Sequence, residues 1–209
     1  MKFSVKALTL GLMSVLFAAN AAYASSYTYY LTVDGCTGTC GTGPYGEITL
    51  DDFGGTGLVN VLVDLYDPNL FVRTGAGNAL QFNLDGDPAI TSSNILNLTP
   101  GFGLGTAKDL GLFGSFNYAI ECTACGTGGS DPKPGPLSFD LSLAGITIDS
   151  FVENDKGFYF TSDIMGANRN TGNVGANDTT PPAVPEPASL VLLGSGLTFI
   201  GARLRRKSA

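Results

Sequence analysis

The chain of 209 residues contains no histidine and no tryptophan. Without histidine, neither a Ser-His-Asp triad nor a Cys-His pair can form, and no metal site can use an imidazole ligand. A glycosidase needs only two carboxylates. The chain has acidic residues for such a pair: Glu47, Glu121, Glu153, Asp51 and Asp52. No pattern around them indicates a cleft or a raised pKa, so we expect a protein that is not an enzyme.

Basic residues are scarce outside the two ends of the chain. The whole chain has 11 Lys and Arg against 18 Asp and Glu. Six of the basic residues lie in the first 24 and the last seven positions. Between Ser25 and Thr180, five basic residues against 17 acidic ones give a formal charge of −12. Such a domain repels phosphate groups, so we expect no nucleic-acid partner. The acidity is typical of a soluble extracellular domain, with cation binding as the alternative.

The N-terminus has the pattern of a secretory signal peptide. Lys2 and Lys6 precede an uncharged run over residues 7–19, and Ala22 and Ala24 flank Tyr23 in an A-x-A cleavage site. The pattern predicts handling by the Sec translocon and signal peptidase, with residues 1–24 removed and Ser25 as the new N-terminus. The apolar run is shorter than the ~18 residues of a membrane span, which disfavours an uncleaved anchor.

The C-terminus carries a proline motif, an apolar run and a basic cluster. The motif is Val184, Pro185, Glu186 and Pro187. Its prolines prevent a helix from beginning upstream, so the uncharged run starts abruptly and covers residues 188–202. The basic residues that follow are Arg203, Arg205, Arg206 and Lys207. By the positive-inside rule, this order predicts a transmembrane helix in the inner membrane with a cytoplasmic C-terminus.

Residues 184–209 resemble the PEP-CTERM sorting signal of Gram-negative bacteria, over about an eighth of the chain. The resemblance implies an exosortase partner, an integral membrane cysteine protease or transpeptidase, and processing near Pro185 to Pro187. It implies a transient stay in the inner membrane and then the cell surface or extracellular matrix, where this family is associated with exopolysaccharide and biofilm. The alternative is a simple C-terminally anchored periplasmic protein. The length of the apolar run disfavours this alternative. A helix of 15 residues reaches only about 22 Å, whereas the hydrocarbon core of a membrane is about 30 Å thick.

Residues 25–165 predict an all-β domain. Apolar and polar residues alternate over 27–33, 80–84 and 137–143, which is the period of a strand with one buried face. Further strands are expected at 46–50, 58–65, 116–122, 146–152 and 157–161. Without a sustained helical period, these strands predict an antiparallel β-sandwich of jelly-roll or immunoglobulin-like architecture. Residues 166–183 have Val174 as their only large aliphatic residue before Val184, so we predict a flexible linker.

The four cysteines occur as two close pairs, Cys36 with Cys40 and Cys122 with Cys125. Export favours disulfides, and the sequence allows three connectivities. We favour the two local pairs, because each lies in a Gly/Thr-rich loop at the end of an expected strand. A four-thiolate zinc site and a thioredoxin-type redox motif are the alternatives.

Calcium and sugar are the remaining ligand hypotheses. Asp85 and Asp87 flank a glycine turn and offer hard oxygen ligands, as do Asp51, Asp52, Asp64 and Asp67, but no EF-hand pattern is complete. We expect no obligatory cofactor. Tyrosines could stack on exopolysaccharide in a glycan-binding adhesion module. The candidates are Tyr27, Tyr29, Tyr30, Tyr45 and Tyr66.

Overall fold

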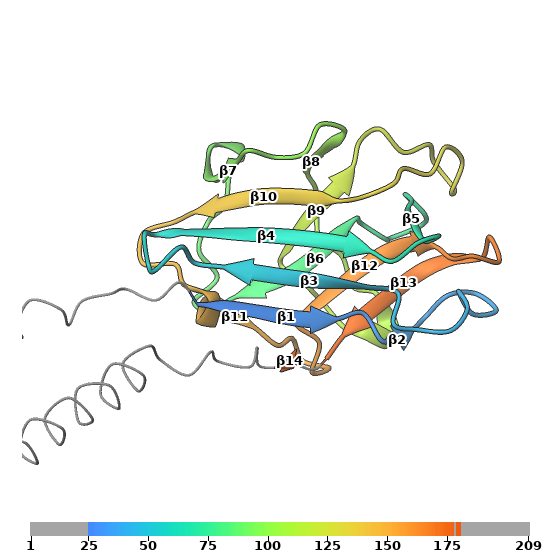
Figure 1. Ribbon diagram of the computed structural model, residues 1–209, viewed down its shortest axis with the longest axis horizontal. Coiled ribbons are helices and arrows are strands. Elements are labelled where there is room, and N and C mark those ends of the chain that lie inside the picture. The colour runs from blue at the N-terminus through green and yellow to red at the C-terminus, as the bar shows by residue number, and fades with distance from the viewer. Residues whose placement is uncertain (1–24, 178, 181–209) are drawn as a thin grey trace, which may run out of the picture.

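The computed structural model describes residues 25–177 and 179–180, which fold into two antiparallel sheets (Figure 1). Within this part of the chain there is no α-helix, only the 3₁₀ turns η1 (Ser92–Asn94), η2 (Gly111–Phe113) and η3 (Ile148–Ser150). The all-β prediction is confirmed. The finer expectation of jelly-roll or immunoglobulin-like connections stays a prediction.

The first sheet has its strands in the order β14 (Thr179–Thr180), β1 (Ser26–Tyr30), β3 (Gly46–Asp51), β4 (Leu58–Leu65), β10 (Leu137–Ser142) and β7 (Ile95–Leu96). The second has the order β2 (Val33–Asp34), β13 (Thr171–Ala176), β12 (Phe160–Met165), β6 (Leu80–Leu84), β9 (Tyr118–Cys122) and β8 (Phe102–Leu104). Two short strands lie beside this path: β5 (Leu70–Phe71) pairs with β12, and β11 (Phe151–Val152) pairs with β6.

The core lies between the two sheets and follows the alternation of the sequence. Along β3, β4 and β10 every second residue is buried, as the period-2 pattern predicts. Aromatic rings join the layers: Tyr29 of β1 meets Phe160 of β12 edge to face at a ring-centroid distance of 4.9 Å. Burial of these apolar faces is the main stabilising contribution of the fold.

Two strand predictions need correction in the segment 146–161. The middle of the expected strand at 146–152 is instead the 3₁₀ turn η3, and only Phe151 and Val152 form a strand, which pairs with β6. The expected strand at 157–161 begins later and continues through Met165 as β12. The reason for the late start is a turn in which the Gly157 amide donates to the Asn154 carbonyl, with Gly157 at a φ of +79°.

The prediction of a flexible linker over residues 166–183 is wrong for its first part. Strand β13 lies inside that range and pairs with β12 over its whole length, from Phe160↔Ala176 to Met165↔Thr171. Val174 and Ala176 are fully buried in the core. The segment is ordered by its long-range pairing, although its own composition is polar and glycine-rich. Residues 178 and 181–183 of the predicted linker lie outside the described part of the chain.

Candidate functional site

The clearest sequence patterns are at the two ends of the chain, which the sequence predicts to be targeting signals, and most of these residues lie outside the described part. These are Ala22, Ala24, the motif Val184 to Pro187, and the basic residues Arg203, Arg205, Arg206 and Lys207. In the part that the structure describes, no helix is long and apolar enough to cross a membrane. The transmembrane helix expected at 188–202 is outside that part.

The points where the two ends join the domain are next to each other. The Ser25 backbone nitrogen donates to Asp52 Oδ1 at 3.0 Å, immediately before β1 begins. At the other end, Thr179 and Thr180 of β14 pair with Tyr29 and Thr28 of the same strand β1. The first and last described residues, Ser25 and Thr180, therefore both lie beside strand β1 of the first sheet (Figure 1).

All four cysteines are bridged, and the pairing is the local one that the sequence favoured. Cys36 pairs with Cys40 at a Cα–Cα distance of 5.5 Å, and Cys122 pairs with Cys125 at 5.3 Å. With no free thiol left, the cysteines form neither a four-thiolate zinc site nor a reduced redox pair in this state.

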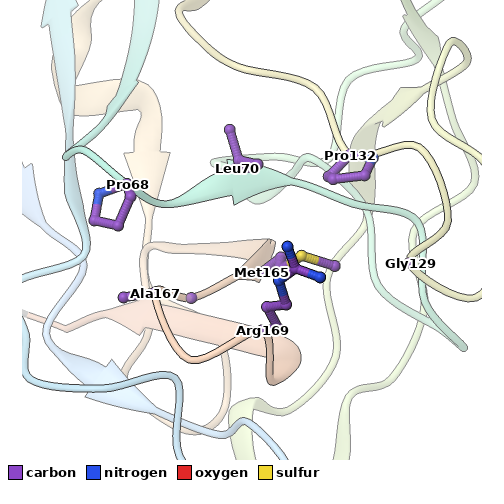
Figure 2. Close-up of a pocket in the computed structure, with 8 residues that line it drawn as sticks. Pro68, Leu70, Gly129, Pro132, Met165, Ala167 and Arg169 are labelled. Atoms are coloured by element: carbon purple, nitrogen blue, oxygen red, sulfur yellow. The ribbon is translucent and has the colours of Figure 1, made fainter.

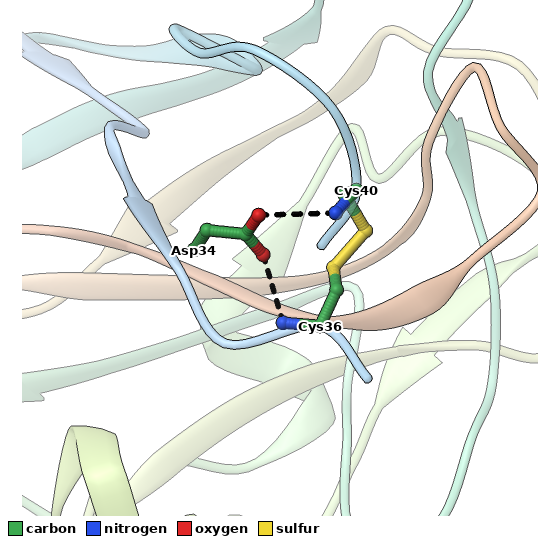
Figure 3. Close-up of side chains that lie close together, drawn as sticks. All are labelled: Asp34, Cys36 and Cys40. Carbon is green, nitrogen blue, oxygen red and sulfur yellow. Dashed lines mark hydrogen bonds between the residues drawn. A yellow bond between two sulfur atoms is a disulfide. The ribbon is translucent and has the colours of Figure 1, made fainter. Parts of the chain in front are cut away.

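Asp34 lies against the first disulfide, and Figure 3 shows its carboxylate between Cys36 and Cys40. The backbone amides of these two residues donate to it at 2.8 and 3.0 Å, and the Tyr45 hydroxyl donates at 2.9 Å. The Thr39 hydroxyl also donates. Burial acts to raise the pKa of Asp34, but these hydrogen bonds together hold it below its usual value. The carboxylate thus accepts four hydrogen bonds, three of them from the loop that carries the disulfide. We interpret Asp34 as a residue that holds this loop in place and not as a cation ligand.

The same contact removes one of the predicted sugar platforms. Tyr45 is only 3% exposed and its hydroxyl is used on Asp34. Tyr66 donates to Glu47 Oε2 at 2.7 Å, so both groups are tied to the outer face of the first sheet. Glu47 lies on β3 of the first sheet, whereas Glu121 lies on β9 of the second sheet. The two therefore form no carboxylate pair across a cleft.

The predicted calcium residues are not brought together with further ligands. Asp87 Oδ1 accepts hydrogen bonds from the Asn117 side chain and from the Tyr118 hydroxyl. Among residues 25–177, only Asp34, Cys36 and Cys40 form a group of three side chains of the metal-ligating kinds. Asp51 and Asp52 accept backbone amides of their own turn. Calcium at Asp85 and Asp87 stays a prediction.

An apolar hollow of about 410 Å³ lies beside the β12–β13 turn (Figure 2). Pro68, Leu70, Pro132 and Met165 supply its apolar walls, and Arg169 supplies the one charged side chain. A ligand site normally adds several polar groups that converge on the ligand. This hollow offers a single exposed guanidinium, so it is a weak candidate.

A larger groove, of about 580 Å³, lies at the open edge between the two sheets. It is lined by Tyr27, Tyr29, Ile148, Asp149, Phe151, Val152, Glu153 and Tyr159. The sequence pointed to Tyr27 and Tyr29 as sugar-binding candidates and to Glu153 as an acidic one, but not to their meeting. Asp149 and Tyr159 were not predicted, because long-range pairing of β11 and β12 with β6 brings them here.

A buried carboxylate, Asp163, lies on the outward face of β12 beneath the turn at residues 74–78. Its oxygens accept the Thr74 amide at 2.6 Å and the Thr74 hydroxyl at 2.7 Å. Burial raises the pKa of Asp163 to about 6, although the bonds from Thr74 act in the opposite direction. Compared with the unfolded chain, the folded state therefore favours the protonated carboxyl.

We expect the stability of the domain to depend on this proton. Because the folded pKa is raised above its usual value of 3.8, the stabilisation is complete only below pH 3.8 and is lost as the pH rises through about 6. Relative to the neutral variant Asp163→Asn, the wild-type free energy of unfolding should fall by about 2 kcal/mol between pH 4 and pH 7. Urea unfolding of both proteins across this range measures the difference. A constant difference would contradict the assignment.

The comparison with known families locates one match, at the C-terminus. Residues 183–207 match the family model described as the PEP-CTERM protein-sorting motif. The predicted sorting signal is thereby confirmed, and the chain carries a PEP-CTERM motif. No curated protein and no solved structure matches the chain significantly.

Proposed function

We propose that this protein is exported by the Sec translocon, cut after Ala24, sorted by an exosortase, and delivered to the cell surface or extracellular polysaccharide matrix of a Gram-negative bacterium. There the β domain has a structural role and is not an enzyme. The observation that carries the proposal is the PEP-CTERM motif at residues 183–207, which includes the apolar run and the basic end. The motif supports export and membrane-associated sorting, and the matrix role is the further step.

The N-terminal end of the domain is consistent with cleavage after Ala24. A cut there turns the Ser25 nitrogen into an ammonium group, and this nitrogen already lies 3.0 Å from the Asp52 carboxylate. Asp52 is only 8% exposed. An ion pair at this place strengthens the contact, since hydrogen bonds between charged groups are roughly twice as strong as neutral ones.

The sorting proposal is tested by the mass of the protein from its native host. We expect the wild-type protein to begin at Ser25 and to lack the residues after about Pro187. Replacement of Pro185, Glu186 and Pro187 by alanine should abolish this processing and leave a chain that ends at Ala209 in the inner membrane, because the motif that exosortase recognises is gone.

A matched control replaces the prolines just upstream, Pro181→Ala and Pro182→Ala, and should be processed like the wild type. The alternative function, a simple C-terminally anchored periplasmic protein, gives a different result. In that case the wild-type protein from the host still ends at Ala209, and deletion of the exosortase changes nothing.

A further inference from the structure

We propose that the groove between β1 and the η3–β11 segment binds an uncharged polysaccharide chain. This inference rests on the proposed function, because a matrix protein meets polysaccharide at high concentration. It adds to that function a specific site, a ligand class and the residues that make contact. The argument uses four features of the groove: its aromatic wall, an unpartnered hydroxyl, its two carboxylates and its charge.

The aromatic wall comes from both sheets. Tyr27 and Tyr29 lie at alternate positions of β1, so their rings point to the same face, toward the second sheet. Tyr159 comes from the residue before β12, and its ring centroid lies 4.8 Å from that of Tyr29. Tyr27 and Tyr159 are half-buried and leave part of each ring accessible to a ligand. Tyrosine offers an apolar ring and a polar hydroxyl, which suits the apolar face and hydroxyl rim of a pyranose.

Tyr29 brings an unpartnered hydroxyl to the floor of the groove. Tyr29 is 4% exposed, and within the described ranges its hydroxyl makes no hydrogen bond but keeps contact with solvent. Burial raises the pKa of Tyr29, and the neighbouring Tyr159, Tyr27, Asp149 and Glu153 add to the effect. A hydroxyl of the ligand can pair with it, since a phenolic hydroxyl both donates and accepts hydrogen bonds.

Two carboxylates line the same groove as that hydroxyl. Asp149 in η3 and Glu153 after β11 are exposed and line the same groove. The Glu153 carboxylate lies beside the Tyr159 hydroxyl and, after burial, raises the pKa of that tyrosine. An ionised carboxylate accepts hydrogen bonds at both oxygens, so it can receive two neighbouring hydroxyls of one sugar ring. Aromatic walls with a few convergent polar groups are the usual composition of a ligand site.

The charge of the groove selects among polysaccharides. No basic side chain is among the residues that line it, and the domain around it has a formal charge of −12. A uronate or sulfate group would have to approach Asp149 and Glu153 without a compensating cation. We therefore infer that the ligand is built from neutral or N-acetylated hexoses, and that anionic polymers are rejected.

The test is calorimetry with the mature protein purified from its host. The probes are dextran and chitohexaose as uncharged chains, alginate as an anionic one, and the exopolysaccharide of the host, each with calcium and with chelator. We expect saturable binding of at least one uncharged probe, no binding of alginate, and no effect of chelator. Failure of both uncharged probes, or binding that chelator abolishes, overturns the proposal.

Three substitutions test the groove itself. Tyr29→Phe removes only the unpartnered hydroxyl, so it should weaken binding about tenfold without lowering the melting temperature. Tyr27→Ala and Glu153→Gln should each weaken binding at least tenfold. The matched controls are Tyr30→Ala, on the opposite face of β1, and Asp85→Asn, an exposed carboxylate elsewhere. Both should bind like the wild type.

The outcomes separate this inference from the proposed function. Binding of the host exopolysaccharide that Tyr27→Ala and Glu153→Gln leave unchanged overturns the groove and keeps the matrix role. A protein that binds through the groove but retains Ala209 and stays in the inner membrane supports the site and overturns the sorting proposal.

Discussion

A domain fragment that ends at Met165 should fail to fold, whereas one that ends at Thr180 should unfold cooperatively. Removal of β13 takes away a strand that pairs with six residues of β12 and two of β2. It also deletes the buried Val174 and Ala176 and uncovers the edge of β12. The lost burial and backbone hydrogen bonds amount to about 5 kcal/mol or more, against a total stability of about 5–15 kcal/mol for a typical domain.

The two fragments, 25–165 and 25–180, are compared by circular dichroism and urea unfolding. The expected result is a cooperative transition for the longer fragment and none for the shorter. Equal transition midpoints would mean that β13 contributes nothing to stability and that the sequence-based linker prediction was right after all.

Replacement of Phe82 by alanine should lower the free energy of unfolding by about 3–5 kcal/mol, because it opens a cavity where the two sheets meet. Phe82 is 1% exposed on β6, near the middle of the second sheet. Its ring lies 5.5 Å from those of Tyr118 and Phe151, and 6.3 Å from that of Phe139 on the opposite sheet. Each of these contacts is lost or weakened in the variant.

Leu112→Ala is the control for this variant. Leu112 is equally apolar but 61% exposed in η2, so its truncation should change the stability by no more than about 0.5 kcal/mol. Urea unfolding of the wild type and both variants gives the comparison. Similar losses for Phe82→Ala and Leu112→Ala would contradict the assigned core.

The strands that the sequence predicts well are those whose burial follows a period of two. Strand β4 is found at the predicted residues, 58–65, and β10 and β6 within one residue of their predicted ends. In these strands one face meets the core and the other does not, so the pattern records the fold directly. The disulfide pairing could also be predicted, because the two cysteines of each pair are only three or four residues apart in the sequence.

Strand β13 could not be predicted from the sequence, because its glycines meet the space requirements of residues that are distant in the chain. Its sequence, Thr-Gly-Asn-Val-Gly-Ala, lacks alternation and resembles a linker. Gly175 lies under the Phe113 ring, where a Cβ would stand 2.6 Å from a ring carbon. Gly166, in the turn before β13, would place a Cβ 2.0 Å from the Cys40 carbonyl oxygen. These glycines allow close approach, a requirement that composition alone does not reveal.

The sequence predicts only part of the groove between β1 and the η3–β11 segment. Tyr27 and Tyr29 share a face by alternation, which the sequence predicts. Their meeting with Asp149, Glu153 and Tyr159 depends on how β11 and β12 pair with β6, some 70 residues earlier in the chain. Tyr45 failed as a platform for the converse reason, because a hydrogen bond to Asp34 holds it inside.

The short pairing of β14 with β1 decides how the domain responds to mechanical load. A pull through the C-terminal segment reaches Thr180 first, and among the described residues two pairs hold β14 to β1. The next strand, β13, is held by six pairs with β12 and two with β2. Strand β14 should therefore separate from β1 first and lengthen the C-terminal segment, while the remaining strands of both sheets and the groove stay intact under tension. Under a pulling force on the C-terminal segment, β14 would separate from β1 before the rest of the fold is disrupted.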